Sequence, residues 1–249
     1  CVSGSVEDFV AAMNETAQRL GMTHSHFQNP NGLDADGHYA SARDMAALTA
    51  YALKKEAFRR IVSTASITIG ERYLANHNKL LRLYEGCLGV KTGFTKAAGR
   101  TLVSAAERDG MTLVCVTLHD GDDWNDHMAM LDYGFAHYKL ETAVPAGRVL
   151  ASVLVRNGTA ASVPLVADGD LSYPLAEGER LTVAAEVPLS ISAPVVPGQA
   201  VGVARAYLNG EAVASVALVA AAPSALRGAL DEEPEHFWQK LFGQSGAGR

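Results

Sequence analysis

The segment Cys87-Leu-Gly-Val-Lys-Thr-Gly-Phe-Thr95 carries the most informative pattern in this sequence of 249 residues. Its centre, Lys91-Thr92-Gly93, supplies in succession a cation, a hydroxyl group and a backbone without a side chain. Two apolar runs follow at residues 101–106 and 111–118, and Asp109-Gly110 lies between them. Because Asp-Gly readily adopts the positive φ angles of a tight turn, this region predicts successive antiparallel strands.

The predicted strand at residues 91–95 has the chemistry to bind a peptide carboxylate. A peptide that adds along a sheet edge makes main-chain hydrogen bonds, while neighbouring side chains select its end group. Alternation places Lys91, Gly93 and Thr95 on one face, and Thr92 joins them only if the strand twists. Gly93 lets a substrate backbone approach, and a charge-assisted contact from Lys91 is worth about 1.5–3 kcal/mol. The simpler alternative is a surface strand with an exposed lysine.

Further blocks of the sequence share their order and spacing with one protein family. These blocks are Thr23-His-Ser-His-Phe-Gln-Asn-Pro-Asn-Gly-Leu-Asp34, Ala75-Asn-His-Asn-Lys-Leu-Leu81, Gly89-Val-Lys-Thr-Gly-Phe-Thr95 with Gly99-Arg-Thr-Leu102, and Leu131-Asp-Tyr-Gly-Phe135. Through them the chain resembles the low-molecular-mass D-alanyl-D-alanine carboxypeptidases, which are penicillin-binding proteins of the serine peptidase type. The resemblance covers most of residues 5–138. It implies a transpeptidase/β-lactamase-like α+β domain, hydrolysis of the terminal D-Ala-D-Ala bond of peptidoglycan stem peptides, and acylation by β-lactam antibiotics.

The resemblance also implies roles for the residues of the strand. Lys91 and Thr92 would bind the substrate carboxylate, with Gly93 and Thr95 beside them. The backbone N–H of Phe94 would be one of two oxyanion donors, and such a donor is typically worth about 2.7–4 kcal/mol in the transition state. Some relatives add an arginine ahead of their last helix, but here that stretch, residues 120–126, is acidic and cannot replace it.

The nucleophile of such an enzyme is not found in these 249 residues. Penicillin-recognising serine enzymes combine the motifs S-x-x-K, S-x-N and K-T-G, and no serine of this sequence begins either of the first two. In similar proteins both motifs lie upstream of the segment that residues 3–9 resemble. We therefore expect the catalytic serine and its lysine to lie upstream of Cys1, a carboxypeptidase domain incomplete at its N-terminus, and no activity from this chain alone.

Three alternatives remain open. The first alternative is a catalytically silent module that binds cell-wall peptides. The second is a related β-lactamase or esterase on the same scaffold, which the additional C-terminal β-domain disfavours. A lipid-modified Cys1 is the competing explanation of where the chain starts. The family resemblance places the protein outside the cytoplasm, in the cell envelope, although the sequence carries no export signal.

Hydrophobic periodicity predicts mixed helices and an antiparallel sheet, hence an α+β domain, over residues 1–140. Ser5 and Ser41 each begin a capping pattern ahead of a helix, and Gly21 ends the first. A shorter core helix is expected near residues 57–62 and a closing helix at residues 124–138. The long loop at residues 29–37 is rich in turn-forming residues.

The composition of the sequence changes after Pro145, where short runs rich in valine and alanine alternate with turns that contain glycine. This spacing predicts a small all-β sandwich over residues 141–222. In the tail, residues 223–249, four apolar residues stand at helical spacing and predict a short amphipathic helix. That helix either contacts the membrane peripherally or packs against the sandwich. The four residues are Phe237, Trp238, Leu241 and Phe242.

Composition and spacing argue against several other classes of function. A net charge of −6 without a cluster of Lys or Arg argues against nucleic acid as a partner. The spacing of a zinc or calcium site is missing both in the histidines and aspartates of residues 24–38 and in the aspartates of residues 120–126. No metal and no cofactor is therefore expected. The second set suits the N-terminus of a helix, and Cys87 and Cys115 are expected to be buried as small apolar residues.

Overall fold

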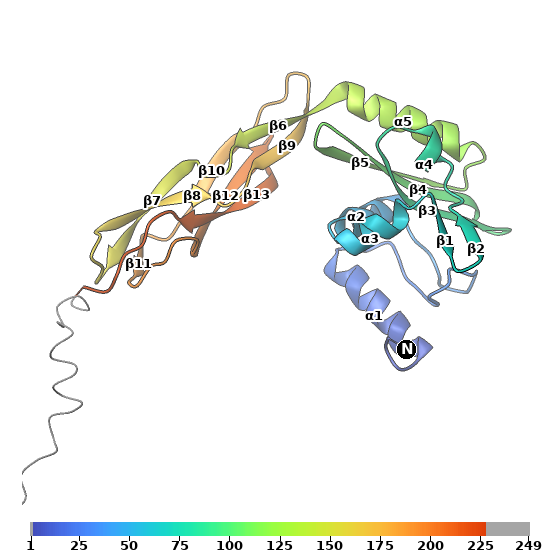
Figure 1. The fold of residues 1–249 in the computed structure, drawn as a ribbon, viewed down its shortest axis with the longest axis horizontal. Coiled ribbons are helices and arrows are strands. Elements are labelled where there is room, and N and C mark those ends of the chain that lie inside the picture. The colour runs from blue at the N-terminus through green and yellow to red at the C-terminus, as the bar shows by residue number, and fades with distance from the viewer. Residues whose placement is uncertain (1, 228–249) are drawn as a thin grey trace, which may run out of the picture. The chain divides into compact units, whose positions relative to one another are not determined.

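The structure, a computed structural model, describes residues 2–227. The chain divides into two compact units, Cys1–Lys139 and Leu140–Arg249, which are described separately below (Figure 1). The division falls one residue ahead of the predicted boundary. Within the described residues, no helix has the length and apolar content needed to cross a membrane.

The first unit combines helices with a three-stranded sheet and a separate two-stranded hairpin. Its helices are α1 (Val6–Arg19), α2 (Ala42–Leu53), α3 (Glu56–Val62), α4 (Leu80–Leu83) and α5 (Asp123–His137). Its strands are β1 (Ser66–Ile69) and β2 (Arg72–Ala75), which form the hairpin, and β3 (Cys87–Thr95), β4 (Gly99–Arg108) and β5 (Met111–Leu118), which form the sheet.

The sheet has the order β3-β4-β5, and both pairings are antiparallel. The turn between β4 and β5 is the predicted Asp-Gly turn, since Asp109 and Gly110 have φ angles of 50° and 77°. Positive φ at both central positions matches the twist of the two strands. The predicted order of strands in this region is thereby confirmed.

Helices cover both faces of this sheet. Helix α5 packs across β4 and β5 on one face, and α2 contacts the same strands from the other face (Figure 1). The core under α5 consists of Leu80, Tyr84, Leu102, Ala106 and Leu131, with Cys87 and Cys115 packed against it. Both cysteines are half-buried, so the expectation that they are buried is met only in part. Burial raises the pKa of the Cys115 thiol to about 11.

The predicted helix caps are present, but burial of the helices differs from expectation. Ser5 Oγ accepts a hydrogen bond from the Asp8 N–H at 3.0 Å, and Ser41 Oγ accepts one from the Asp44 N–H at 3.1 Å. The prediction of α3 as a core helix was wrong, because none of its residues is buried and Ile61 is 67% exposed. Helix α4 has only four residues, too few for a periodic pattern, and the sequence did not indicate it.

The second unit is all-β, as predicted. A six-stranded sheet has the order β10-β12-β13-β8-β7-β11, and β6 pairs with β9 in a two-stranded sheet. The first strand begins at Tyr138, directly after α5, so the predicted helix ends one residue early. The strands are β6 (Tyr138–Val144), β7 (Val149–Arg156), β8 (Ser162–Ala167), β9 (Leu171–Ala176), β10 (Thr182–Glu186), β11 (Ser190–Ser192), β12 (Ala200–Leu208) and β13 (Glu211–Ala220).

The core of this unit is aliphatic and comes from alternate positions of its strands. Val153, Val163, Leu165, Leu171 and Leu218 are each at most 1% exposed and belong to one cluster. Side chains at every second position of a strand point to the same face. The valine- and alanine-rich runs are therefore the inner faces of the strands. The predicted amphipathic helix at residues 235–242 lies outside the described residues.

The aliphatic core gives a direct test of the second unit. Leu165 is fully buried, whereas Val149 in the neighbouring strand is 56% exposed. We expect Leu165→Ala to lower the free energy of unfolding by about 2–5 kcal/mol, since it removes buried methyl groups and leaves a cavity. The control Val149→Ala should change it by about 0.5 kcal/mol or less. Urea denaturation followed by circular dichroism measures both, and equal effects of the two substitutions would contradict this assignment of the core.

Candidate functional site

Strand β3 lies at an edge of its sheet, since the order is β3-β4-β5. On its outer side it pairs with no strand of residues 2–227. Alternate residues of an edge strand direct their N–H and C=O groups away from the sheet. The edge of β3 can therefore accept an extended peptide through main-chain hydrogen bonds.

The side chain of Lys91 is exposed on this edge strand. Its ammonium group donates a hydrogen bond to the backbone carbonyl oxygen of Thr92, and it makes no ion pair among the described residues. Thr92 is half-buried, while Phe94 is 70% exposed. The positive charge of Lys91 is thus available to an anionic ligand.

Gly93 is held close to the neighbouring strand. It pairs with Thr101 of β4, and a Cβ atom at position 93 would lie 2.5 Å from the Thr101 Oγ1 atom. Any larger residue would therefore displace the threonine side chain. This packing is a second reason for glycine here, in addition to the predicted approach of a ligand.

The hydroxyl group of Thr95 already both donates and accepts a hydrogen bond. It donates to the Asp34 Oδ1 atom at 2.9 Å, and it accepts a hydrogen bond from the Ala98 N–H at 2.9 Å. Its only proton is committed to Asp34, so in this arrangement Thr95 can meet a ligand only as an acceptor. Asp34 was not predicted to belong to this site, because it precedes Thr95 by 61 residues and no spacing motif connects them.

The loop that carries Asp34 is fastened to the helices before and after it. The side chain of Asn14 in α1 bonds both the N–H and the C=O of Phe27, at 2.9 and 2.8 Å. Asp44 in α2, only 5% exposed, accepts from the His24 N–H at 2.9 Å and from the Ser25 hydroxyl at 2.8 Å. Burial alone would raise the pKa of Asp44, but these hydrogen bonds outweigh it and lower the pKa.

The histidines of this region do not gather around a common point. His24 and His26 are exposed, and His38 accepts a hydrogen bond from the Gln28 N–H at 3.1 Å. In the described part of the chain, no group of three or more His, Cys, Asp or Glu side chains could hold a metal ion.

A buried histidine connects α5 to the sheet behind the edge strand. His127 is fully buried, with its Nδ1 atom 2.6 Å from Ser104 Oγ and its Nε2 atom 3.1 Å from Thr117 Oγ1. Ser104 pairs with Val90, next to Lys91. Burial lowers the pKa of His127 to about 4, against the opposing effect of Asp123 and Asp120. The imidazole is therefore neutral at neutral pH and aligns α5, β4 and β5.

The acidic stretch at residues 120–126 forms the N-terminus of α5, as predicted. Asp122 is the N-cap residue, and Asp123 and Asp126 lie in the first turn. Arg100, which pairs with Phe94 across the sheet, donates from its Nη2 atom to the buried Asp123 at 2.6 Å. This arginine is thereby neutralised locally, and the negative potential of Asp120 raises the pKa of Asp126.

The buried histidine predicts an acid-sensitive fold. The pKa of His127 is about 4 when folded and 6.5 when free, so as the pH falls below 6.5 the unfolded chain binds the proton first. Stability should be unaffected above pH 6.5 and should fall by about 3 kcal/mol between pH 6.5 and 4. Urea denaturation of the wild type and of His127→Gln at several pH values measures this. Equal pH slopes in the two proteins would contradict it.

The contact between Gly93 and Thr101 predicts a compensating pair of substitutions. We expect Gly93→Ala to lower the free energy of unfolding by about 1–2 kcal/mol through overpacking. The double variant Gly93→Ala/Thr101→Ala should recover most of that loss, since the clashing oxygen is gone. Thermal melts of the two variants and of Thr101→Ala alone measure the coupling. Additive effects would show that the close contact does not explain the glycine.

Comparison with known proteins gives consistent matches over both units. Residues 1–122 match the family model for D-alanyl-D-alanine carboxypeptidase of peptidase family S11, and residues 138–223 match the model for the C-terminal domain of penicillin-binding protein 5. The D-alanyl-D-alanine carboxypeptidase DacF of Bacillus subtilis is 32% identical over 86% of this chain and 58% of its own length. DacA of Escherichia coli is 31% identical over 96% of this chain and 60% of its own length. The chain thus spans somewhat more than half the length of these relatives.

Solved structures have the same fold. Penicillin-binding protein 5 from Haemophilus influenzae superposes with a TM-score of 0.66 at 29% identity, over 90% of this chain and 67% of that one. Penicillin-binding protein 3 from Streptococcus pneumoniae superposes with a TM-score of 0.75 at 23% identity, over 90% and 71% of the two chains. The predicted fold class, a transpeptidase-like α+β domain followed by a small β-sandwich domain, is confirmed.

Proposed function

Since the chain belongs to the D-alanyl-D-alanine carboxypeptidase family of low-molecular-mass penicillin-binding proteins, we propose that it supplies the carboxylate-binding strand of a serine-type carboxypeptidase. That enzyme removes the terminal D-Ala from peptidoglycan stem peptides and is acylated by β-lactam antibiotics. The observation that carries the proposal is the exposed Lys91 on an unpaired strand edge, within the part of the chain that the family model matches.

In the proposed complex, the stem peptide lies extended along the outer edge of β3. Lys91 and Thr92 bind its terminal carboxylate, and Gly93 allows the peptide backbone to approach. Thr95, whose hydroxyl proton is committed to Asp34, borders the site but donates no hydrogen bond to the carboxylate in this arrangement. A β-lactam carries a carboxylate that uses the same contacts.

The chemical step is an acyl transfer to serine. The serine oxygen attacks the carbonyl carbon of the scissile peptide bond, and the N–H of Phe94 stabilises the oxyanion that forms. The D-Ala amine then leaves with a proton, and water hydrolyses the acyl-enzyme to regenerate the serine. We propose that the serine and its lysine come from polypeptide outside residues 1–249, so that this chain alone is inactive. The substrate places the reaction in the cell envelope.

A second candidate function is a silent module that binds cell-wall peptides. It is favoured by one observation, the lack of S-x-x-K and S-x-N motifs in the 249 residues. Such a module would bind a peptide ending in D-Ala-D-Ala through Lys91 without forming a covalent bond. Titration of the chain with such a peptide, followed by penicillin labelling, distinguishes binding from acylation.

Fluorescent penicillin tests the main proposal. We expect no labelling of the 249-residue chain, and labelling of a chimera that joins the N-terminal part of DacF from Bacillus subtilis to it. In the chimera, Lys91→Ala should slow acylation at least about tenfold, since loss of a charge-assisted contact is worth about 1.5–3 kcal/mol. Gel fluorescence against time measures the rate.

Lys96 provides the matched control, because it is also an exposed lysine and lies just beyond β3. Lys96→Ala in the same chimera should acylate at the unchanged rate, and thermal melts verify that both variants fold. Labelling of the 249-residue chain at a serine, or equal rates for the two variants, would reject the proposal.

A further inference from the structure

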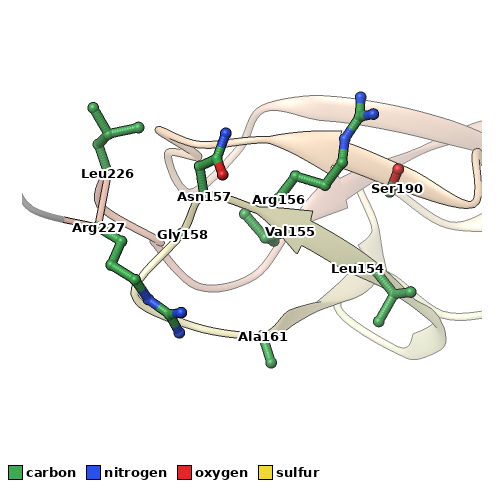
Figure 2. Close-up of a pocket in the computed structure, with 9 residues that line it drawn as sticks. All are labelled: Leu154, Val155, Arg156, Asn157, Gly158, Ala161, Ser190, Leu226 and Arg227. Atoms are coloured by element: carbon green, nitrogen blue, oxygen red, sulfur yellow. The ribbon is translucent and has the colours of Figure 1, made fainter.

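The second unit contains a hollow of about 790 Å³ at the end of β7 (Figure 2). Its lining includes Arg156 and Arg227, whose side chains extend to opposite sides of the turn at Asn157 and Gly158. These two charges therefore do not converge on one ligand. In the first unit, by contrast, the carboxylate of Asp34 meets the end of β3 from a loop far away in the sequence.

Asp34 places a carboxylate beside the end of β3. Its Oδ1 atom accepts the hydroxyl proton of Thr95 at 2.9 Å, and the residue is exposed. Within residues 2–227 it makes no ion pair. An ionised carboxylate has about four acceptor sites on its two oxygens, so Asp34 can bind a cation and keep its hydrogen bond to Thr95.

Hydrogen bonds within the loop hold Asp34 in this position. The side chain of Asn29 donates to the Leu33 C=O at 2.9 Å and accepts from the Gly32 N–H at 2.8 Å. The carboxylate is thus held both by its own loop and by β3. Because the group is already ordered, binding a ligand there costs little conformational entropy.

In the proposed complex, the roles of Lys91, Thr92 and Phe94 determine the direction of the bound peptide. The terminal carboxylate lies at Lys91 and Thr92, and the scissile carbonyl oxygen lies at the Phe94 N–H. The peptide therefore runs antiparallel to β3. The D-Ala that supplies the scissile carbonyl lies opposite Phe94, so the residue before it lies opposite Thr95.

The side chain of the peptide residue opposite Thr95 lies on the side of Asp34. Residues directly opposite each other on antiparallel strands direct their side chains to the same face, and on that face Asp34 bonds the Thr95 hydroxyl. Opposite Cβ atoms are about 4.5–5.5 Å apart, and the Asp34 oxygen lies a further 2.9 Å from the hydroxyl. A side chain with a four-carbon stem, such as that of lysine, is long enough to reach Asp34, whereas a methyl group is not.

The other charges at this end of the strand leave Asp34 without an ion pair among the described residues. Lys96, the nearest cation to Thr95 in the sequence, lies in the turn after β3 and makes no ion pair within residues 2–227. Asp36, in the same loop as Asp34, adds a second exposed carboxylate. Two carboxylates and one lysine therefore favour a cationic side chain over an anionic one here.

We propose that Asp34 is a specificity-determining residue, which binds the ammonium group on the side chain that precedes the terminal D-Ala-D-Ala. The substrate class is then a peptide whose third residue from the carboxyl end carries a free side-chain amine. This inference rests on the proposed function, because it takes the position of the carboxylate from Lys91 and Thr92. Blocking the amine removes the ion pair and leaves the other contacts of the peptide in place.

Two tripeptides test the inference on the full 249-residue chain. Nα-acetyl-Lys-D-Ala-D-Ala and its Nε-acetylated form have the same terminal carboxylate and differ in the charge of the side chain. Titrations followed by nuclear magnetic resonance measure both dissociation constants at low ionic strength, where an exposed ion pair is least screened. We expect the peptide with the free amine to bind at least threefold more tightly. This preference should shrink when the salt concentration is raised to about 0.5 M.

Two variants of the loop locate the preference. Asp34→Asn should reduce the ratio of the two dissociation constants to about one, because the amide carries no charge. Asp36→Asn is the matched control, since it changes an exposed carboxylate of the same loop and alters the net charge equally. It should keep at least a twofold preference, and the amide spectrum verifies that each variant folds.

The outcomes separate this inference from the proposed function. Lys91→Ala should weaken the binding of both peptides by the same factor. If the wild type binds both peptides equally, or if Asp34→Asn and Asp36→Asn change the preference alike, the inference is overturned and the proposed function stands. If the wild type binds neither peptide, or if Lys91→Ala leaves both affinities unchanged, the carboxylate site itself is rejected, and the inference with it.

Discussion

The antiparallel pairing of β3 with β4 positions the strand residues of the candidate site, Lys91 to Thr95. Strand β4 is the middle strand of its sheet, and residues Leu102 to Ala106 are all buried. It cannot shift without exposing apolar surface on both faces, at a cost of about 25 cal/mol per Å². The register that places Lys91 opposite Val103 and Gly93 opposite Thr101 is therefore rigid. The candidate groups belong to the edge of the sheet, but the core determines their positions.

Among the described residues, the charges around the edge strand leave Lys91 without an ion-pair partner. Arg100, across from Phe94, is paired with the buried Asp123 on the side of α5. Asp34 faces Thr95 and not Lys91 in the hydrogen bonds of the described residues. In the proposed complex, a carboxylate that approaches the strand meets Lys91, which has no ion-pair partner among the described residues. The anionic Asp34 at the far end of the strand disfavours a second carboxylate there.

Local signals predicted the features that depend on few neighbouring residues. The caps at Ser5 and Ser41 and the turn at Asp109 and Gly110 depend on backbone preferences within four residues, and all are present. Lys91, Thr92 and Gly93 could be proposed as site residues because they are adjacent in sequence. Contacts between residues far apart in the sequence leave no local pattern from which they could be predicted. The hydrogen bonds between Thr95 and Asp34 and between His127 and both Ser104 and Thr117 bring together residues 10 to 61 positions apart. The exposure of α3 depends on which elements pack against it. The hydrophobic periodicity of α3 itself gives no information about those elements.

The hydrogen bond from Lys91 to the carbonyl oxygen of Thr92 has a consequence for recognition. Without a ligand the ammonium group is not fully hydrated, since it already has a partner on its own strand. The ammonium group has three N–H donors, so in the proposed complex a carboxylate can bind while one donor stays on that carbonyl oxygen. In that complex, a carboxylate gains a charge-assisted hydrogen bond that a neutral peptide end, such as an amide, does not.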